Sequence, residues 1–95
     1  MAELRVVWQP RAWQSFVRTL QHLSAQDAMA AELVARRVEE ALAVLATRPD
    51  IGTLTLAPGR RSFPVPRTGH TIDYRVVRDE LRISRWARQT RHRPG

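Results

Sequence analysis

The sequence contains no cysteine and no lysine, and each absence narrows the possible chemistry. Without cysteine the chain can form neither a disulfide nor a thiolate metal site. All 16 basic side chains are therefore arginines, which stay charged at physiological pH and present a planar fork suited to carboxylate and phosphate. No apolar run approaches the roughly 18 residues that a membrane span needs. We expect a soluble cytoplasmic protein with no metal, no cofactor and no membrane contact.

The charge of the chain is concentrated in its last third. The formal net charge is +7, and residues 59–95 carry ten arginines against three acids, whereas residues 1–58 carry six of each. Such a segment implies an anionic partner, either nucleic acid or an acidic protein segment. A GC-rich genome would also explain the absence of lysine, but it would not explain why the charge is segregated.

The first half of the chain predicts a short strand and two helices. Alternating residues over 4–8 are typical of a strand, and Pro10 is favourable in the first turn of a helix. Helical apolar spacing predicts helices over about 10–23 and 25–47, with a capping box at 24–27 between them. The expected core residues are Trp13, Phe16, Val17 and Leu20 in the first helix and Val34, Val38, Ala41, Leu42 and Leu45 in the second.

The second half predicts three strands joined by tight turns. Residues 50–58 form a connector, in which we expect Leu54 and Leu56 to pack against the core. Residues 61–66, 70–77 and 81–86 alternate apolar and polar side chains. The first of these contains two prolines that cannot donate to a ladder, so we expect it to lie at an edge or to end early.

The alternation also assigns side chains to the two faces of the sheet. In the last strand, Leu81 and Ile83 should face one way and Arg82, Ser84 and Trp86 the other. Tyr74 should face the core. From about residue 87 the apolar pattern ends and a basic tail begins.

These elements predict one α+β domain over residues 1–95, in the order β-α-α-β-β-β. Ninety-five residues with 43% apolar side chains suffice for one modest core. The helical hairpin packs on one face of a small, mostly antiparallel sheet, and the other face displays arginine.

Several short motifs accompany this order of elements. They are Trp8-x-Pro10-x-Ala12, Leu45-x-x-x-Pro49-x-x-Gly52, Gly59-x-Arg61, Val65-Pro66-x-Thr68-Gly69, Ile72-x-Tyr74-Arg75-Val76 and Leu81-x-Ile83 followed by Arg88-Gln89. In this order they resemble the RelE/ParE superfamily of toxins from type II toxin–antitoxin systems, most closely the ParE branch. ParE-like chains often carry a histidine after the last strand, just before an arginine, whereas this sequence has Trp86-Ala87-Arg88.

The resemblance implies a toxin that a cognate antitoxin neutralises by wrapping it. ParE-type members are understood to poison DNA gyrase, and RelE-type members cleave messenger RNA on the ribosome. Metal-independent cleavage needs an acid, a base and cations around the phosphate. The candidates for that chemistry are Arg61, Arg82, Arg85 and His92. No metal-ligand cluster, Ser/His/Asp arrangement or glycine-rich phosphate loop accompanies them.

We favour inhibition of gyrase by binding over catalysis, because lysine and a C-terminal tyrosine are absent and His92 lies in the basic tail. The expected antitoxin- or target-binding residues are Arg60, Arg61, Arg75, Arg82, Arg85, Trp86, Arg88 and Arg91. Trp86 could be an exposed binding residue or could close the core. The alternatives to gyrase inhibition are a ribosome-dependent mRNA endonuclease and a non-toxic basic nucleic-acid-binding module.

Overall fold

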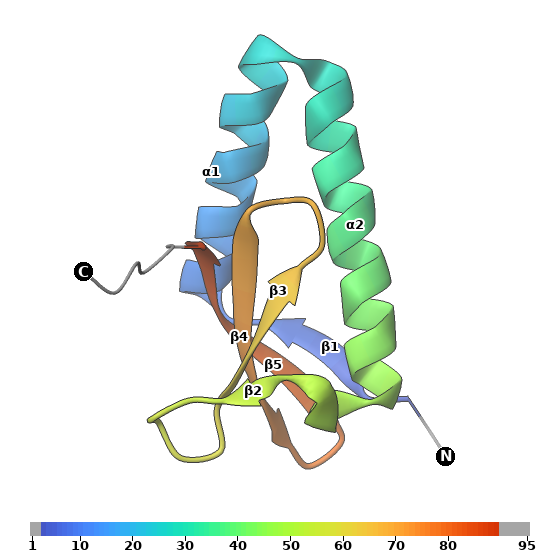
Figure 1. Cartoon of the computed structure of the whole chain (residues 1–95), viewed down its shortest axis with the longest axis vertical. Coiled ribbons are helices and arrows are strands. Elements are labelled where there is room, and N and C mark those ends of the chain that lie inside the picture. The colour runs from blue at the N-terminus through green and yellow to red at the C-terminus, as the bar shows by residue number, and fades with distance from the viewer. Residues whose placement is uncertain (1–2, 90–95) are drawn as a thin grey trace, which may run out of the picture.

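A computed structural model describes residues 3–89 as a two-helix hairpin packed on one face of a five-stranded sheet (Figure 1). The elements are β1 (Arg5–Trp8), α1 (Pro10–Gln26), α2 (Ala28–Thr47), the 3-10 helix η1 (Pro49–Ile51), β2 (Thr53–Leu54), β3 (Arg61–Val65), β4 (His70–Val77) and β5 (Glu80–Arg88). The predicted α+β class is confirmed. Neither described helix is long and apolar enough to cross a membrane.

The strands lie in the order β1-β5-β4-β3-β2. The pairs β2–β3, β3–β4 and β4–β5 are antiparallel, whereas β1 runs parallel to β5 because the helical hairpin forms the crossover between β1 and the rest of the sheet. The hairpin lies against the sheet at its base and projects beyond it at its far end (Figure 1). Among residues 3–89, no helix covers the other face of the sheet.

The segment predicted as a connector contains an additional edge strand, β2. Leu54 is 62% exposed and Leu56 is fully exposed, so the expectation that both pack against the core is wrong. Thr55 holds this loop in place: its amide donates to the carbonyl of Arg60 at 2.9 Å, and its hydroxyl donates to the same oxygen at 3.1 Å. Backbone pairing and this hydrogen-bonded turn fix the segment without burying its leucines.

The two helices join at Asp27, and the predicted capping box is wrong. α1 continues through Ser24 to Gln26. The Asp27 carboxylate accepts hydrogen bonds from the amides of Met29 at 3.0 Å and Ala30 at 3.3 Å. Aspartate is itself a strong N-cap, so α2 begins three residues later than predicted.

The core lies between the hairpin and the sheet. Its buried members are Ala12, Phe16, Val34, Val38, Ala41, Leu42, Leu45, Val65, Ile72, Tyr74, Leu81, Ile83 and Trp86. The predicted stripe of α2 is confirmed in full. Of the residues predicted for the core in α1, only Phe16 is buried; Leu20 packs partly buried against the core, and Val17 is half-buried outside it. Trp13 is 49% exposed and rests edge-on against Trp8 at 5.6 Å between ring centroids, while Ala12 occupies the buried position.

A β-bulge in β5 changes which face its last residues occupy. Tyr74 pairs with Ile83, but the preceding residue Asp73 pairs with Arg85, so Ser84 is the extra residue on β5. Such an insertion reverses the alternation of the residues that follow. Trp86 consequently faces the helices and is only 5% exposed, which corrects its predicted placement beside Arg82.

The last strand also ends later than the sequence pattern suggested. β5 continues to Arg88, where it pairs with His70, so Ala87 and Arg88 belong to the sheet and not to a basic tail. The Gln89 amide donates to the carbonyl of Gly69 at 2.7 Å, which extends this contact by one residue.

Candidate functional site

Three of the expected binding residues lie on the helix-free face of the sheet. Arg75 and Arg82 are cross-strand partners, and Arg85 lies opposite Asp73. Tyr74 and Leu81 are buried under the helices, so alternation directs the adjacent Arg75 and Arg82 to the outer face. Arg85 reaches this face because of the bulge at Ser84. The strand pattern predicts the outward positions of Arg75 and Arg82, whereas strict alternation would place Arg85 with Leu81 and Ile83 on the core face.

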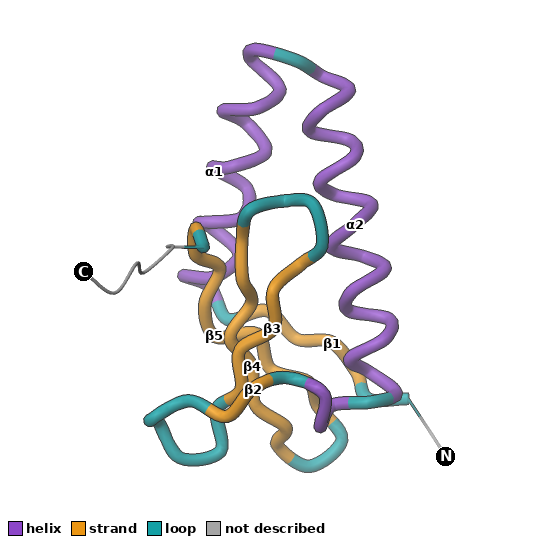
Figure 2. Tube along the Cα trace, in the orientation of Figure 1, coloured by secondary structure: helices purple, strands orange, loops and turns teal. Residues whose placement is uncertain are grey.

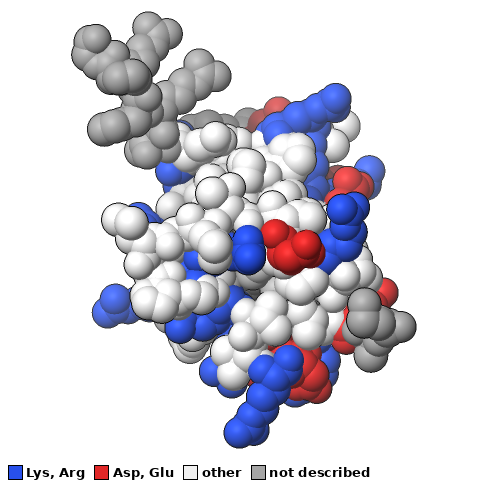
Figure 3. All heavy atoms as spheres, turned by 60° about the horizontal axis from the view of Figure 1, so that its bottom comes forward, with Lys and Arg blue, Asp and Glu red and all other residues white. Residues whose placement is uncertain are grey.

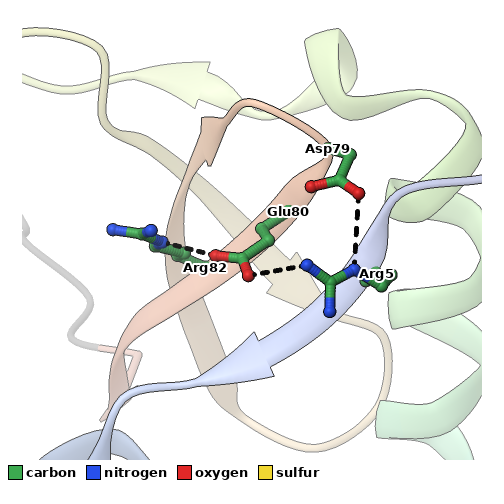
Figure 4. Close-up of polar contacts among 4 residues, drawn as sticks. All are labelled: Arg5, Asp79, Glu80 and Arg82. Carbon is green, nitrogen blue, oxygen red and sulfur yellow. Dashed lines mark hydrogen bonds and ion pairs between the residues drawn. The ribbon is translucent and has the colours of Figure 1, made fainter.

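Acidic side chains partly neutralise the positive charge of this outer face. Figure 4 shows Arg5 between two carboxylates, with its Nε 3.4 Å from Asp79 and its Nη2 3.0 Å from Glu80. The other oxygen of Glu80 accepts from the Nε of Arg82 at 2.8 Å. Exposed pairs of this kind stabilise a fold by only about 0–1 kcal/mol each. Their effect here is to reduce the uncompensated charge at Arg82.

Arg60 also lies beside an acid, so the arginines predicted for binding do not form one cluster of unpaired cations. Its Nη1 lies 3.7 Å from the carboxylate of Asp73, and its buried Nε has no hydrogen-bond partner among the described residues. Seen from the end of the molecule that bears the strand turns, arginines lie scattered and several adjoin acids (Figure 3). Of the predicted outer-face residues, Arg75 and Arg85 form no ion pair within the described chain.

Arg61 lies on the opposite side of the sheet from these arginines. It pairs across the strands with Tyr74, and its Nη1 donates to the carbonyls of Asp50 at 3.1 Å and Gly52 at 2.7 Å. Arg61 therefore anchors the loop before β2, and this contact restricts its use for binding or catalysis.

The hydroxyl of Tyr74 also anchors the loop before β2. Its hydroxyl donates to the carbonyl of Pro49 at 2.6 Å and accepts from the amide of Gly52 at 3.0 Å. Burial raises the pKa of Tyr74, and the Gly52 hydrogen bond opposes that effect. The predicted core orientation is confirmed, and the phenol is committed to backbone groups.

A second collection of arginines, which the sequence did not reveal, surrounds a cavity of about 700 Å³ between the hairpin and the β3–β4 turn. Figure 2 shows that turn lying across the helices. The polar residues lining the cavity include Arg18, His22, Arg37, Arg67, His70 and Arg88. They come from separate elements, so no local spacing could have identified them. Of the predicted binding residues, Arg88 and the inner surface of Trp86 also line this space.

The remaining predicted residues, Arg91 and His92, lie outside the described residues. Among residues 3–89 there is no group of three or more His, Asp or Glu side chains that could hold a metal ion. The predicted site residues thus divide among an outer sheet face, a loop anchor, the core and the edge of a cavity.

The fold and the distribution of arginines define a small basic α+β protein in which the described helices cover one face of the sheet. The chain belongs to the ParE toxin family of type II toxin–antitoxin systems, because the model of that family (ParE toxin, parDE) matches residues 6–90. The solved structure of a chromosomal ParDE TA system from P. aeruginosa is similar to it with a TM-score of 0.79. That match covers 93% of this chain and 98% of the other at 19% identity, and it supports the shared fold. No curated protein matches the chain.

Proposed function

We propose that the chain is a toxin that acts in the cytoplasm by binding DNA gyrase and that a cognate antitoxin neutralises it. The observation that carries this proposal is the outer sheet face, where Arg75 and Arg85 project without a carboxylate partner among the described residues. Arginine recognises carboxylate and phosphate through paired hydrogen bonds, so this face suits an acidic protein surface or the DNA held by gyrase. Membership of the ParE family supports the same assignment.

The geometry gives less support to messenger RNA cleavage. Arg61 is engaged with two backbone carbonyls, and Arg82 is paired with Glu80. Cleavage would require these cations to converge with an acid and a base around one phosphate. Arg61 instead points to the opposite face of the sheet from Arg82, so the set cannot enclose one phosphate in this arrangement.

A different surface suits the antitoxin. Met29, Leu33 and Val44 leave 73%, 43% and 43% of their surface exposed along α2. β2 pairs only with Arg61 and Ser62, so the rest of β3 remains an edge on the described part of the sheet. A partner that covers both features would bury apolar area, and salt would weaken such a complex only partly because apolar contacts are not screened.

The test is induction of the chain in a bacterium while DNA supercoiling, filamentation and transcript integrity are followed together. Gyrase inhibition predicts an SOS response and filaments with intact transcripts, and co-expression of the antitoxin encoded beside the chain should restore growth. Transcripts cut at defined codons during translation arrest would refute the proposal in favour of the nuclease. The absence of any toxic effect would favour the non-toxic binding module.

Matched variants locate the surface responsible. The Arg75→Glu/Arg85→Glu variant should abolish gyrase inhibition in a purified supercoiling assay. The control is Arg11→Glu/Arg48→Glu, which changes two exposed arginines at the ends of the helices by the same charge. If both variants lose activity equally, overall charge and not the outer sheet face carries the effect.

A further inference from the structure

We propose that the cavity between the hairpin and the β3–β4 turn binds the phosphate of a nucleotide, either free or within a single strand. Its volume, about 700 Å³, lies within the roughly 300–1,000 Å³ range of small-molecule sites. The outer sheet face contributes nothing to it, so this inference does not depend on gyrase inhibition.

Four arginines from four different elements surround the cavity. Arg18 comes from α1, Arg37 from α2, Arg67 from the β3–β4 turn and Arg88 from the end of β5. Among the residues that the structure describes, no carboxylate lines the cavity and none of the four arginines forms an ion pair. The cavity therefore concentrates positive charge that the protein itself does not neutralise, unlike the outer face, where acids adjoin the arginines. An anion is the ligand that such a site favours.

The fold holds the guanidinium of Arg37 and the backbone of Arg67 in place. The Nη1 of Arg37 donates to the carbonyl of Arg67 at 2.9 Å. Arg67 itself has a φ of 61°, a left-handed conformation that non-glycine residues rarely adopt. Thr68 fixes the turn, because its hydroxyl donates to the carbonyl of Val65 at 2.9 Å and accepts from the amide of His70 at 3.1 Å. A guanidinium positioned before the ligand arrives loses less entropy on binding.

An aromatic wall lies beside these cations. The ring of His70 stacks flat on Trp86, with 4.6 Å between centroids and 6° between planes. Trp86 is fixed in turn by a hydrogen bond from its Nε1 to the hydroxyl of Thr19 at 3.0 Å. The Nδ1 of His70 lies 3.0 Å from the carbonyl of Thr68, which can only accept, so Nδ1 carries the proton and Nε2 remains available to a ligand.

The combination favours a nucleotide over a simple anion or an acidic peptide. Guanidinium forks match phosphate oxygens in pairs, and a flat ring fixed by a second ring is a platform on which a base can stack. Leu23, Leu33 and Val34 supply an apolar lining that a base or sugar could cover, whereas inorganic phosphate could not. A carboxylate peptide would satisfy the charge but would not use the ring.

Calorimetric titration of the full-length chain with adenosine 5′-monophosphate tests the proposal. Adenosine, inorganic phosphate, a ten-nucleotide single strand and hexaglutamate are titrated in parallel. The cavity variant is Arg18→Gln/Arg88→Gln, and the control is Arg75→Gln/Arg85→Gln, which removes the same charge from the outer sheet face. Circular dichroism confirms that both fold. A separate His70→Ala variant tests the stacking ring without any change in arginine content.

We expect saturable one-to-one binding of the monophosphate and at least tenfold weaker binding of adenosine and of inorganic phosphate. The cavity variant should lose about tenfold or more in affinity, since each charge-assisted hydrogen bond corresponds to roughly that factor, while the control should change less than twofold. His70→Ala should weaken the nucleotide but not inorganic phosphate. Tight binding of the single strand with weak binding of the monophosphate would support the same site and assign the phosphate to a nucleic acid.

Three results would overturn the proposal. Equal losses in the cavity and control variants would mean that net charge alone attracts the ligand. If hexaglutamate binds with the same affinity as the nucleotide, and His70→Ala does not change that affinity, the cavity is a carboxylate site. No measurable binding of the monophosphate or of the single strand at low salt would show that the cavity does not accept this ligand class.

Discussion

Removing one hydroxyl should reveal how much the loop between α2 and β3 depends on Tyr74. The Tyr74→Phe variant keeps the buried ring but leaves the carbonyl of Pro49 and the amide of Gly52 without their partner. A buried polar group without a partner costs about 1–3 kcal/mol. Arg61 still holds the neighbouring carbonyls, so we expect a total loss of about 2–4 kcal/mol in the free energy of unfolding.

The measurement is thermal and urea unfolding of the purified chain. For a domain of this size the loss corresponds to a decrease in Tm of roughly 10–30 °C. The control is Ser84→Ala, which removes a hydroxyl that makes a single 3.2 Å bond to the carbonyl of Asp73 and should cost only about 1 kcal/mol. A loss below about 0.5 kcal/mol for Tyr74→Phe would refute the reasoning.

A second substitution at the same contact separates packing from hydrogen bonding. A Cβ at Gly52 would collide with the Tyr74 hydroxyl and lie 2.9 Å from two ring carbons, so Gly52→Ala alone should destabilise strongly. In the double variant with Tyr74→Phe, part of that collision is relieved. The losses of unfolding free energy in the two single variants should therefore sum to more than the loss in the double variant. Strictly additive losses would contradict the close contact between Gly52 and the Tyr74 ring.

Three further changes test separate features. Burial raises the pKa of Tyr74, so the stability that the neutral phenol contributes is complete below the ordinary pKa of 10.0 and is lost as pH rises through the pKa of the folded state. Tyrosinate absorbance and alkaline unfolding should show this loss in the native chain and not in Tyr74→Phe. Asp27→Ala should cost about 1 kcal/mol in thermal unfolding by removing the cap of α2. Leu45→Ala should cost about 2–5 kcal/mol in urea unfolding, because this side chain is fully buried.

The helical half could be predicted largely from sequence because its core positions repeat with one period. The stripe that includes Val38 and Leu42 is buried as expected. The predictions from sequence are wrong where a local hydrogen bond, and not the apolar pattern, determines the structure. Asp27 caps α2 directly, so the serine-based capping box was unnecessary. Leu54 and Leu56 stay exposed because backbone hydrogen bonds, not apolar contacts, hold their loop. Hydrophobicity alone could not distinguish a leucine that packs from one displayed on a fixed turn.

The candidate site was less predictable than the fold because it depends on contacts between distant segments. The segregation of charge correctly indicated arginines on the sheet, but it could not show that Glu80 and Asp73 engage Arg82 and Arg60. Nothing in the sequence of α2 distinguishes Arg37 as a site residue. Only the folded chain brings it to the turn at Arg67.

The bulge at Ser84 explains why the end of β5 was assigned to the wrong face. One unpaired residue shifts every later side chain to the opposite side, so Trp86 enters the core although strict alternation places it with the arginines. The same shift moves Arg85 to the outer face opposite Asp73, while Trp86 stacks on His70. A single irregularity thus separates the arginines of the outer face from the aromatic wall of the cavity. The two surfaces can therefore be altered independently, which is why arginine pairs of equal charge can distinguish their roles.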